Sequence, residues 1–134
     1  MNYKVTYEGE LRTRSTHLKS DTTILTDAPT DNKGKGETFS PTDLISSGLA
    51  SCMMTLVGIA ANERNLEIEH MEAEVTKKMA SSPRRIEAIS ITLYINAKNL
   101  SEHHKELLQK VAETCPVALS LHPDLRQELE LIFT

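Results

Sequence analysis

The sequence predicts an α+β fold built on antiparallel sheets. Residues 2–28 alternate between polar and apolar types in three short runs separated by turn formers, which indicates a three-stranded meander. Residues 40–65 form one long helical pattern that is apolar on nearly every side. The later patterns follow in the order strand, strand, helix, short helix, strand. Because the strands cluster instead of alternating with helices, a doubly wound parallel sheet is disfavoured.

The N-terminal meander contains two turn signals and ends in a loop. The turns are expected at Gly9–Glu10 and at Lys19–Asp21, and the loop at residues 28–38 is rich in Pro, Asp, Asn and Gly. Lys33 and Lys35 lie between the loop glycines, but their spacing matches neither glycine-rich phosphate-binding pattern. We therefore expect a flexible loop without a phosphate site.

The long helix is expected to begin at Ser40-Pro41. Ser40 can cap it, Pro41 suits the first helical position, and Asp43 can complete a capping box beside the positive end of the helix dipole. A helix that is apolar on nearly every side lies at the centre of a domain. The chain's own sheet can cover one side. A second subunit is the simplest cover for the other, so we predict an obligate homodimer.

Two strands are expected after this helix. In residues 66–80 the apolar positions change face near His70, which predicts a bulge or bend there. Residues 85–97 alternate Ile and Leu with polar residues and give the clearest strand pattern of the chain.

The C-terminal part is expected to hold two helices and a last strand. Ser101 can cap a helix with a narrow apolar stripe. Pro116 interrupts that helix because proline lacks the backbone N–H and crowds the preceding turn. A short helix is expected at residues 117–121 and a final strand at residues 129–133.

Length and composition limit the possible functions. The length of 134 residues suits a single domain, residues 1–134, with an ordinary core. The net charge is −4 with both signs interspersed, so no basic nucleic-acid footprint is present. The N-terminus is typical of a strand and not of a secretory signal, and no stretch is expected to approach the apolar length that a membrane span needs. We therefore expect a cytoplasmic protein with no nucleic-acid or membrane partner.

The two cysteines, Cys52 and Cys115, are the residues best suited to chemistry. They are too far apart for a CxxC pair, and the five histidines lack metal-ligand spacing, so we expect no metal. In a reducing compartment such cysteines are either buried or reactive. One thiol can attack an oxidant and a second can resolve the product as a disulfide. The residues alone leave open both a redox pair and two inert, buried thiols.

A reactive thiol at neutral pH needs a lowered pKa. Cys115 can cap the short helix that follows it, where backbone N–H groups would favour its thiolate. Cys52 lies in the middle of the long helix, where the helix dipole has little effect, so it needs a cation supplied by the fold. The candidate cations are Arg12, Arg14, Lys77, Arg84 and Arg85.

Three segments carry a resemblance to a known family. Phe39–Leu44 leads to Gly48–Met53 around the first cysteine, and Ala112–Val117 holds the second. Together with the order of strands and helices, these segments resemble the OsmC/Ohr family of thiol-dependent hydroperoxide reductases over essentially the whole chain. The resemblance implies an OsmC-like, intertwined homodimer, with antiparallel sheets packed around two long central helices and an active site at the subunit interface.

The resemblance also implies roles for individual residues. Cys52 would be the peroxidatic thiol and Cys115 the resolving thiol. The family arginine follows a turn after the first strand, which matches Arg12, with Arg14 in reserve. An organic hydroperoxide would enter an apolar pocket, a dithiol would reduce the resulting disulfide, and no metal, flavin or haem would take part. Met53, Met54 and Phe39 are the residues expected to line that pocket.

One position departs from the family pattern. Peroxidase members carry a glutamate directly after the helix-start proline, where it orients the arginine, and this chain has Thr42 there. Asp43 is no simple substitute, because at about 100° per residue it lies roughly 180° from Cys52 around the helix. Glu8, Glu10 and Glu37 are further candidate partners for the arginine.

Three functional hypotheses therefore remain, in order of preference. The first is a thiol-dependent peroxidase with an antioxidant role in oxidative stress. The second is a dimer that binds a small apolar ligand or senses thiol oxidation without turnover. The third is a structural dimer with two inert cysteines.

Overall fold

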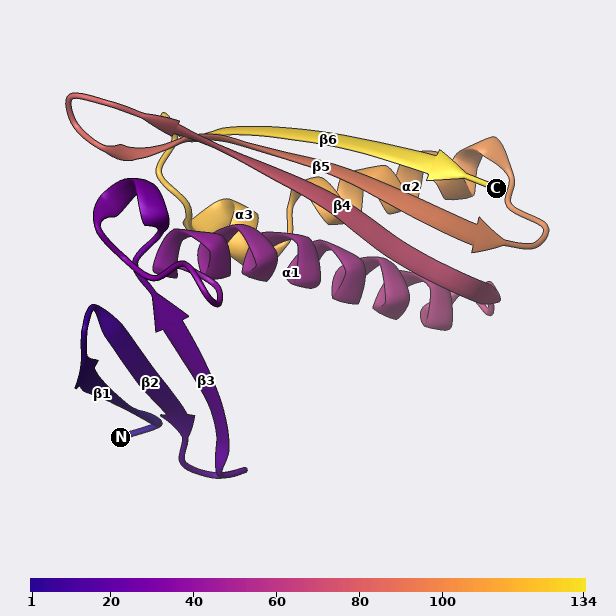
Figure 1. Ribbon diagram of the computed structural model, residues 1–134. Helices are drawn as coiled ribbons and strands as arrows, with labels where there is room; N and C mark the ends of the chain where they lie inside the picture. The colour runs from indigo at the N-terminus through magenta and orange to yellow at the C-terminus, as the bar shows by residue number, and fades with distance from the viewer. The chain divides into compact units, whose positions relative to one another are not determined.

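The computed structural model describes all 134 residues (Figure 1). Its elements are, in chain order, β1 (Tyr3–Gly9), β2 (Arg12–His17), β3 (Thr22–Asp27), the short 3₁₀ helix η1 (Thr30–Asn32), α1 (Pro41–Glu63), β4 (Ile68–Ala80), β5 (Arg85–Ala97), α2 (Glu102–Glu113), α3 (Pro116–Ser120) and β6 (Arg126–Phe133). Contacts within the chain divide it into two compact units, Met1–Ile45 and Ser46–Thr134. Every element expected from the sequence is present.

The first unit is built on an antiparallel sheet in the order β1-β2-β3. The turn between β1 and β2 has left-handed backbone at Gly9, Glu10 and Leu11, with φ values of 87°, 51° and 64°. Glycine adopts this conformation at little cost, whereas Leu11 is strained in it by its own side chain. The turn brings the chain sharply back, so that Arg12 starts β2 opposite Gly9.

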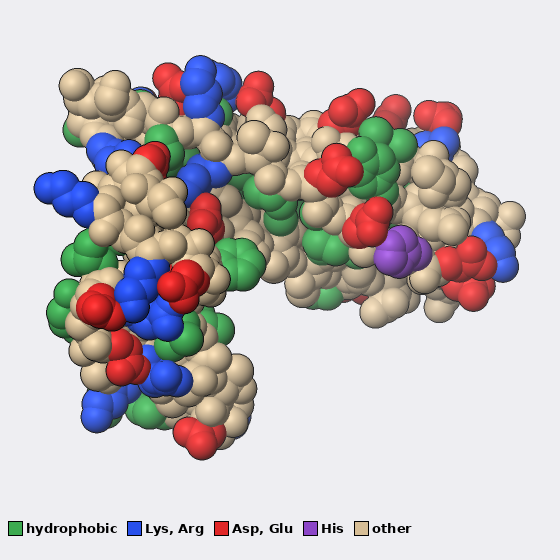
Figure 2. Space-filling model, viewed as in Figure 1, with side chains coloured by type: hydrophobic (Ala, Val, Ile, Leu, Met, Phe, Trp, Pro, Cys, Tyr) green, Lys and Arg blue, Asp and Glu red, His purple; other side chains and the backbone are tan.

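This first unit has no apolar core of its own. None of its apolar side chains is buried, and its buried side chains are Thr26, Asp27 and Ser40. Large apolar side chains reach the surface instead, as the green atoms in Figure 2 show. They are Met1, Tyr3, Val5, Tyr7, Leu11, Leu18, Ile24, Phe39 and Ile45. A three-stranded sheet normally needs one face buried against another layer, so these side chains lack the cover that the sheet requires.

The second unit contains the sheet β4-β5-β6. β4 and β5 are antiparallel, and their pairing shifts register between Ile68 and His70, which confirms the predicted bulge. β6 pairs with β5 in parallel, in contrast to the antiparallel arrangement predicted from the sequence. The reason is the connection: α2 and α3 carry the chain back to the starting end of β5, and such a crossover makes the next strand parallel.

The hydrophobic core lies in the second unit, where α1, β5, α2 and α3 meet (Figure 1). Alternate residues of β5 face inward, which confirms the pattern read from its sequence. Leu49, Met53 and Val57 of α1 project into this core and are fully buried. From α2 and α3 the core receives Leu108, Ala112, Cys115 and Ala118.

The opposite face of α1 is uncovered in this chain. Ile45 and Ile59 are exposed, and Gly48 and Cys52 lie between them on the same stripe of the helix. A Cβ added at Gly48 would meet no atom within 4 Å. The helix is also long and apolar enough to cross a membrane by length and composition, so the expectation that no segment could do so is wrong. Its buried face, however, forms the core just described.

The helix starts are formed as the sequence predicts. The Ser40 N–H donates to Oδ2 of Asp43 at 2.9 Å, and the Asp43 N–H donates to Oγ of Ser40 at 3.1 Å. This is the reciprocal capping box expected for α1. In α2 the Ser101 cap accepts from the N–H of His104, whose ring nitrogen accepts in return from the Ser101 N–H. His104 therefore takes the place usually held by Glu or Gln.

Candidate active site

Cys52 lies near the middle of α1 and is half-buried. Its side chain packs against the edge of the hydrophobic core, while its position on the helix is shared with the uncovered stripe that contains Gly48. A thiol in this position has apolar neighbours on one side and access from the other. Such partial exposure distinguishes reactive cysteines from inert structural ones.

Cys115 is fully buried and forms the N-cap of α3. The N–H of Ala118 donates to its Sγ at 3.4 Å, as the sequence predicts for a capping thiol. The pKa of Cys115 is nevertheless raised. Burial of the sulfur is the largest cause, interaction with Cys52 raises the pKa further, and the N–H groups of Ala118 and Val117 do not offset these effects. The backbone donors therefore favour the thiolate of Cys115 as expected, but burial outweighs them.

The two cysteine side chains lie in the same part of the core. Cys52 is near enough to raise the pKa of Cys115, and it packs against the hydrophobic cluster that contains Cys115. Neither is in a disulfide. The pair therefore joins a half-buried thiol, Cys52, to a buried thiol, Cys115, whose raised pKa keeps it protonated at neutral pH. This division suits a nucleophile and a protonated resolving thiol.

The raised pKa predicts how Cys115 should behave when it is the sole cysteine. In Cys52→Ser, burial remains, so the rate of alkylation by iodoacetamide should rise with pH with a midpoint above about 8.5, the value of a free thiol. Alkylation monitored by mass spectrometry from pH 6 to 10 provides the measurement, with urea-unfolded protein as the control. A midpoint at or below that of the unfolded sample would contradict the burial argument.

Arg12 begins β2 and is held by a buried carboxylate from β3. Nε donates to Oδ1 of Asp27 and Nη2 donates to Oδ2, each at 2.7 Å, which is a two-pronged ion pair. Asp27 is 1% exposed and Arg12 is 27% exposed. The hydrogen bond from Arg12 is the main cause that lowers the pKa of Asp27, and the same bond raises the pKa of Arg12. The pair is therefore ionised throughout the physiological range.

The three glutamates named as candidate partners of the arginine pair with different residues. Glu37 does contact Arg12, through Nη2 at 3.4 Å, but its side chain is 64% exposed. Glu10 pairs with Lys35 at 2.5 Å. Glu8 pairs with Arg14, the reserve arginine, also at 2.5 Å.

Asp27 is the functional candidate that sequence reasoning missed. It was hidden because it ends a strand next to a loop, where an aspartate is unremarkable. The signal that could have found it is the hairpin register. A turn at Lys19–Asp21 places Arg12 opposite residue 27 or 28, and residues directly opposite across antiparallel strands interact. Arg12 and Asp27 are such a pair.

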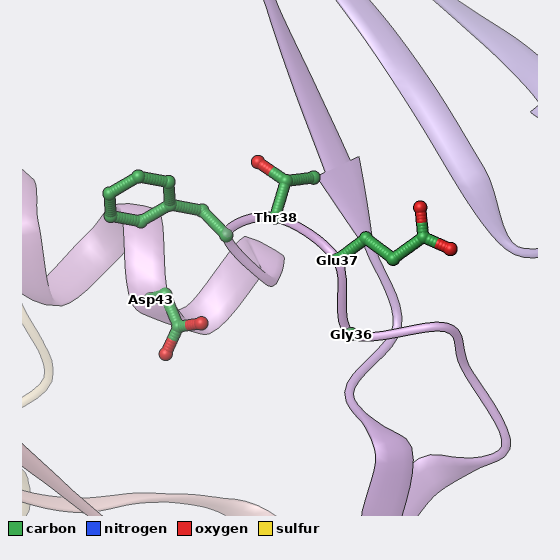
Figure 3. A pocket seen from close by; sticks show the side chains of 5 residues that line it. Gly36, Glu37, Thr38 and Asp43 are labelled. Carbon is green, nitrogen blue, oxygen red and sulfur yellow. The ribbon is translucent and has the colours of Figure 1, made fainter.

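The apolar pocket predicted from the sequence is corrected in part. Met53 is 1% exposed and points into the core, so it cannot line an accessible pocket. Met54 is half-buried and packs against the core. Phe39 is exposed and lines a shallow depression with Glu37, Thr38 and Asp43 (Figure 3). The carboxylates of Glu37 and Asp43 point away from each other there, so no set of polar groups converges on a ligand.

The site residues fall into both compact units. Cys52 and Cys115 belong to Ser46–Thr134, and Arg12 with its partner Asp27 belongs to Met1–Ile45. That Arg12 faces the thiol stays a prediction. No group of three or more His, Cys, Asp and Glu side chains is arranged to hold a metal ion.

Comparisons with known proteins give consistent matches. A model of the family described as OsmC-like protein matches residues 34–130. The organic hydroperoxide resistance protein OhrB of Bacillus subtilis (strain 168) is 32% identical over 133 residues, which are 96% of this chain and 95% of that protein. A crystal structure from Psychrobacter arcticus 273-4, of a proposed osmotic stress induced and detoxification response protein, shows 47% identity and a TM-score of 0.93 over 98% of this chain and 96% of that one.

Proposed function

Because this chain belongs to the family of OsmC-like proteins, we propose that it is a thiol-dependent peroxidase that reduces organic hydroperoxides to alcohols. The observation that carries the proposal is the neighbouring pair of cysteines, one half-exposed on α1 and one buried and protonated at the cap of α3. Its similarity to a protein named for organic hydroperoxide resistance supports a peroxide-related substrate.

The proposed reaction uses the two thiols in sequence. The Cys52 thiolate attacks the distal oxygen of the hydroperoxide, the O–O bond breaks, and the released alkoxide takes up a proton to become an alcohol. Cys52 is then a sulfenic acid. The Cys115 thiol attacks that sulfur, water leaves, and a Cys52–Cys115 disulfide forms. A cytoplasmic dithiol reduces this disulfide by thiol exchange and restores both thiols.

The guanidinium of Arg12 is proposed to act on the first step. A cation beside Cys52 lowers the pKa of the thiol and so increases the fraction of thiolate at neutral pH. A guanidinium suits this role because it stays charged and offers several N–H donors in one plane. The same donors can hold the peroxide oxygen that becomes the alkoxide.

We further propose that the working unit is a homodimer. The sheet of the first unit and the outer stripe of α1 both expose apolar side chains that this chain leaves without cover. A second copy is the partner that carries complementary surfaces of the same kind, in the self-complementary manner of a two-fold dimer. Covering them would also exclude water from the thiol on α1, which strengthens its electrostatic interactions.

The assay for the proposal follows peroxide loss. Purified protein, cumene hydroperoxide and dithiothreitol are mixed, and residual peroxide is measured with time. We expect repeated turnover, and faster consumption of cumene hydroperoxide than of hydrogen peroxide, since an apolar site favours burial of the organic part. Catalytic turnover no faster than that of dithiothreitol alone would contradict the proposal.

Arg12→Ala is expected to slow this reaction about tenfold to a thousandfold at pH 7. A nearby opposite charge shifts a pKa by about 1–3 units, and each unit changes the thiolate fraction about tenfold. The rate of the variant should therefore recover as the pH is raised. Initial rates from pH 6 to 9 give the measurement, and Arg14→Ala is the matched control. Slowing in Arg14→Ala with none in Arg12→Ala would move the role to Arg14.

A dimer that binds an apolar ligand or senses thiol oxidation without turnover is the second candidate. The observation that favours it is Thr42, which lacks the carboxylate that peroxidase members carry at the helix start. One equivalent of cumene hydroperoxide separates the two functions. A peroxidase should form the Cys52–Cys115 disulfide within the time of one turnover, whereas a binding module should keep both thiols reduced.

A further inference from the structure

We propose that Asp27 is a positioning residue that fixes the orientation of the Arg12 guanidinium for the chemistry at Cys52. This inference rests on the proposed function, because it assigns how Arg12 is presented to the thiol. It is carried by three features of the first unit: the two-pronged contact, the burial of the carboxylate, and its second set of hydrogen bonds.

The contact engages one edge of the guanidinium and leaves another free. Asp27 accepts hydrogen bonds from Nε and Nη2 of Arg12. Nη2 also donates to Oε2 of Glu37, at 3.4 Å. The hydrogen bonds of the Arg12 side chain use Nε and Nη2 and leave Nη1 without a partner in the chain. A guanidinium has five N–H donors in a fixed plane, so holding the Nε–Nη2 edge fixes the direction of the two Nη1 donors. These are the donors available to a thiolate or to a peroxide oxygen.

The carboxylate is itself held firmly. Oδ2 of Asp27 also accepts from the Glu37 N–H at 3.2 Å, and the Asp27 N–H donates to the carbonyl of Phe39 at 3.0 Å. Asp27 is therefore tied both to its strand partner and to the segment that enters α1. A buried charge needs such partners, and their number makes this aspartate more rigid than the exposed Glu37.

If Asp27 positions Arg12, removal of its carboxylate should change the pKa of Cys52 in the opposite direction from that expected if it acts by its charge alone. Asp27→Asn deletes a negative charge beside Arg12. By charge alone, the uncompensated guanidinium would favour a nearby thiolate and lower the pKa of Cys52. If Asp27 orients Arg12, however, the amide cannot accept both prongs, Arg12 turns away, and the pKa of Cys52 rises. The direction of the change therefore distinguishes a positioning role from a purely electrostatic one.

The test measures the pH profile of Cys52 without peroxide. Cys115→Ser leaves Cys52 as the sole cysteine, and its alkylation by iodoacetamide is followed from pH 5 to 10. In this background Asp27→Asn should raise the midpoint by about one unit. Glu37→Gln removes a negative charge beside the same guanidinium but keeps the two-pronged contact with Asp27. It should therefore leave the midpoint of Cys52 nearly unchanged. The double variant Asp27→Asn with Arg12→Ala should have the same midpoint as Arg12→Ala alone.

An unchanged or lowered midpoint in folded Asp27→Asn overturns the inference. Arg12→Lys provides a second route if Asp27→Asn does not fold. It keeps the charge but cannot form the fork, so it should also raise the midpoint, and a midpoint like that of the parent overturns the positioning role. If Arg12→Ala leaves the midpoint in place, Arg12 has no role at Cys52 and the inference about Asp27 fails with it. Failure of the proposed function is a separate result, because the parent protein then shows no turnover in the peroxide assay whatever the midpoints are.

Discussion

Cys52→Ser is expected to abolish peroxide consumption, with a loss of about a thousandfold or more in turnover. A serine hydroxyl at neutral pH is a far weaker nucleophile than a thiolate, and without the attacking sulfur no other step can follow. The half-buried position of Cys52 makes the substitution structurally mild, since it changes one atom at the edge of the core. Thermal unfolding of the variant should therefore remain close to that of the parent protein.

Cys115→Ser is the matched control, and it should fail at a different step. The first peroxide should still be reduced, because the nucleophile is intact, but no intramolecular disulfide can form. Dimedone labelling detected by mass spectrometry should then show a sulfenic acid on Cys52, which accumulates when dithiol is absent. If Cys52→Ser retains turnover while Cys115→Ser loses it, the two roles are reversed. If both retain it, the cysteines are not the reacting groups.

Local signals account for the elements that the sequence predicts well. The capping box at Ser40 and Asp43, the Pro116 break and the alternation in β5 each depend on neighbours close along the chain. The parallel pairing of β6 could not be read in this way. Its alternation suits either direction, and the direction is decided by the crossover through α2 and α3.

The same difference between local signals and contacts of distant residues applies to the candidate site. The cysteines could be selected from sequence because each lies in a recognisable segment. The error over Met53 came from a helix that is apolar all round, where no pattern says which face meets the sheet. Asp27 was missed because its partnership with Arg12 needs the exact hairpin register, and a change of one residue would pair Arg12 with Ala28 instead.

Gly48→Leu is the substitution expected to affect assembly most. Within one chain it should be harmless or favourable, because a Cβ at Gly48 meets no atom within 4 Å and leucine is a much better helix former than glycine. If a second copy packs closely along the stripe of Ile45, Gly48 and Ile59, the added side chain prevents that approach. We expect sedimentation analysis to show monomers, together with loss of peroxide consumption.

Gly58→Leu is the matched control, since its Cβ also meets no atom within 4 Å and it makes the same chemical change on the same helix. At about 100° per residue it lies roughly 80° around α1 from Gly48, away from the centre of the uncovered stripe, so the dimer should persist. Both substitutions raise helix propensity, but only Gly48→Leu is expected to clash with a partner subunit. A comparison of the two variants therefore distinguishes these effects. A dimeric, fully active Gly48→Leu would contradict close packing at this stripe. The exposed apolar side chains of the first unit would then be the remaining surface on which a second copy could dock.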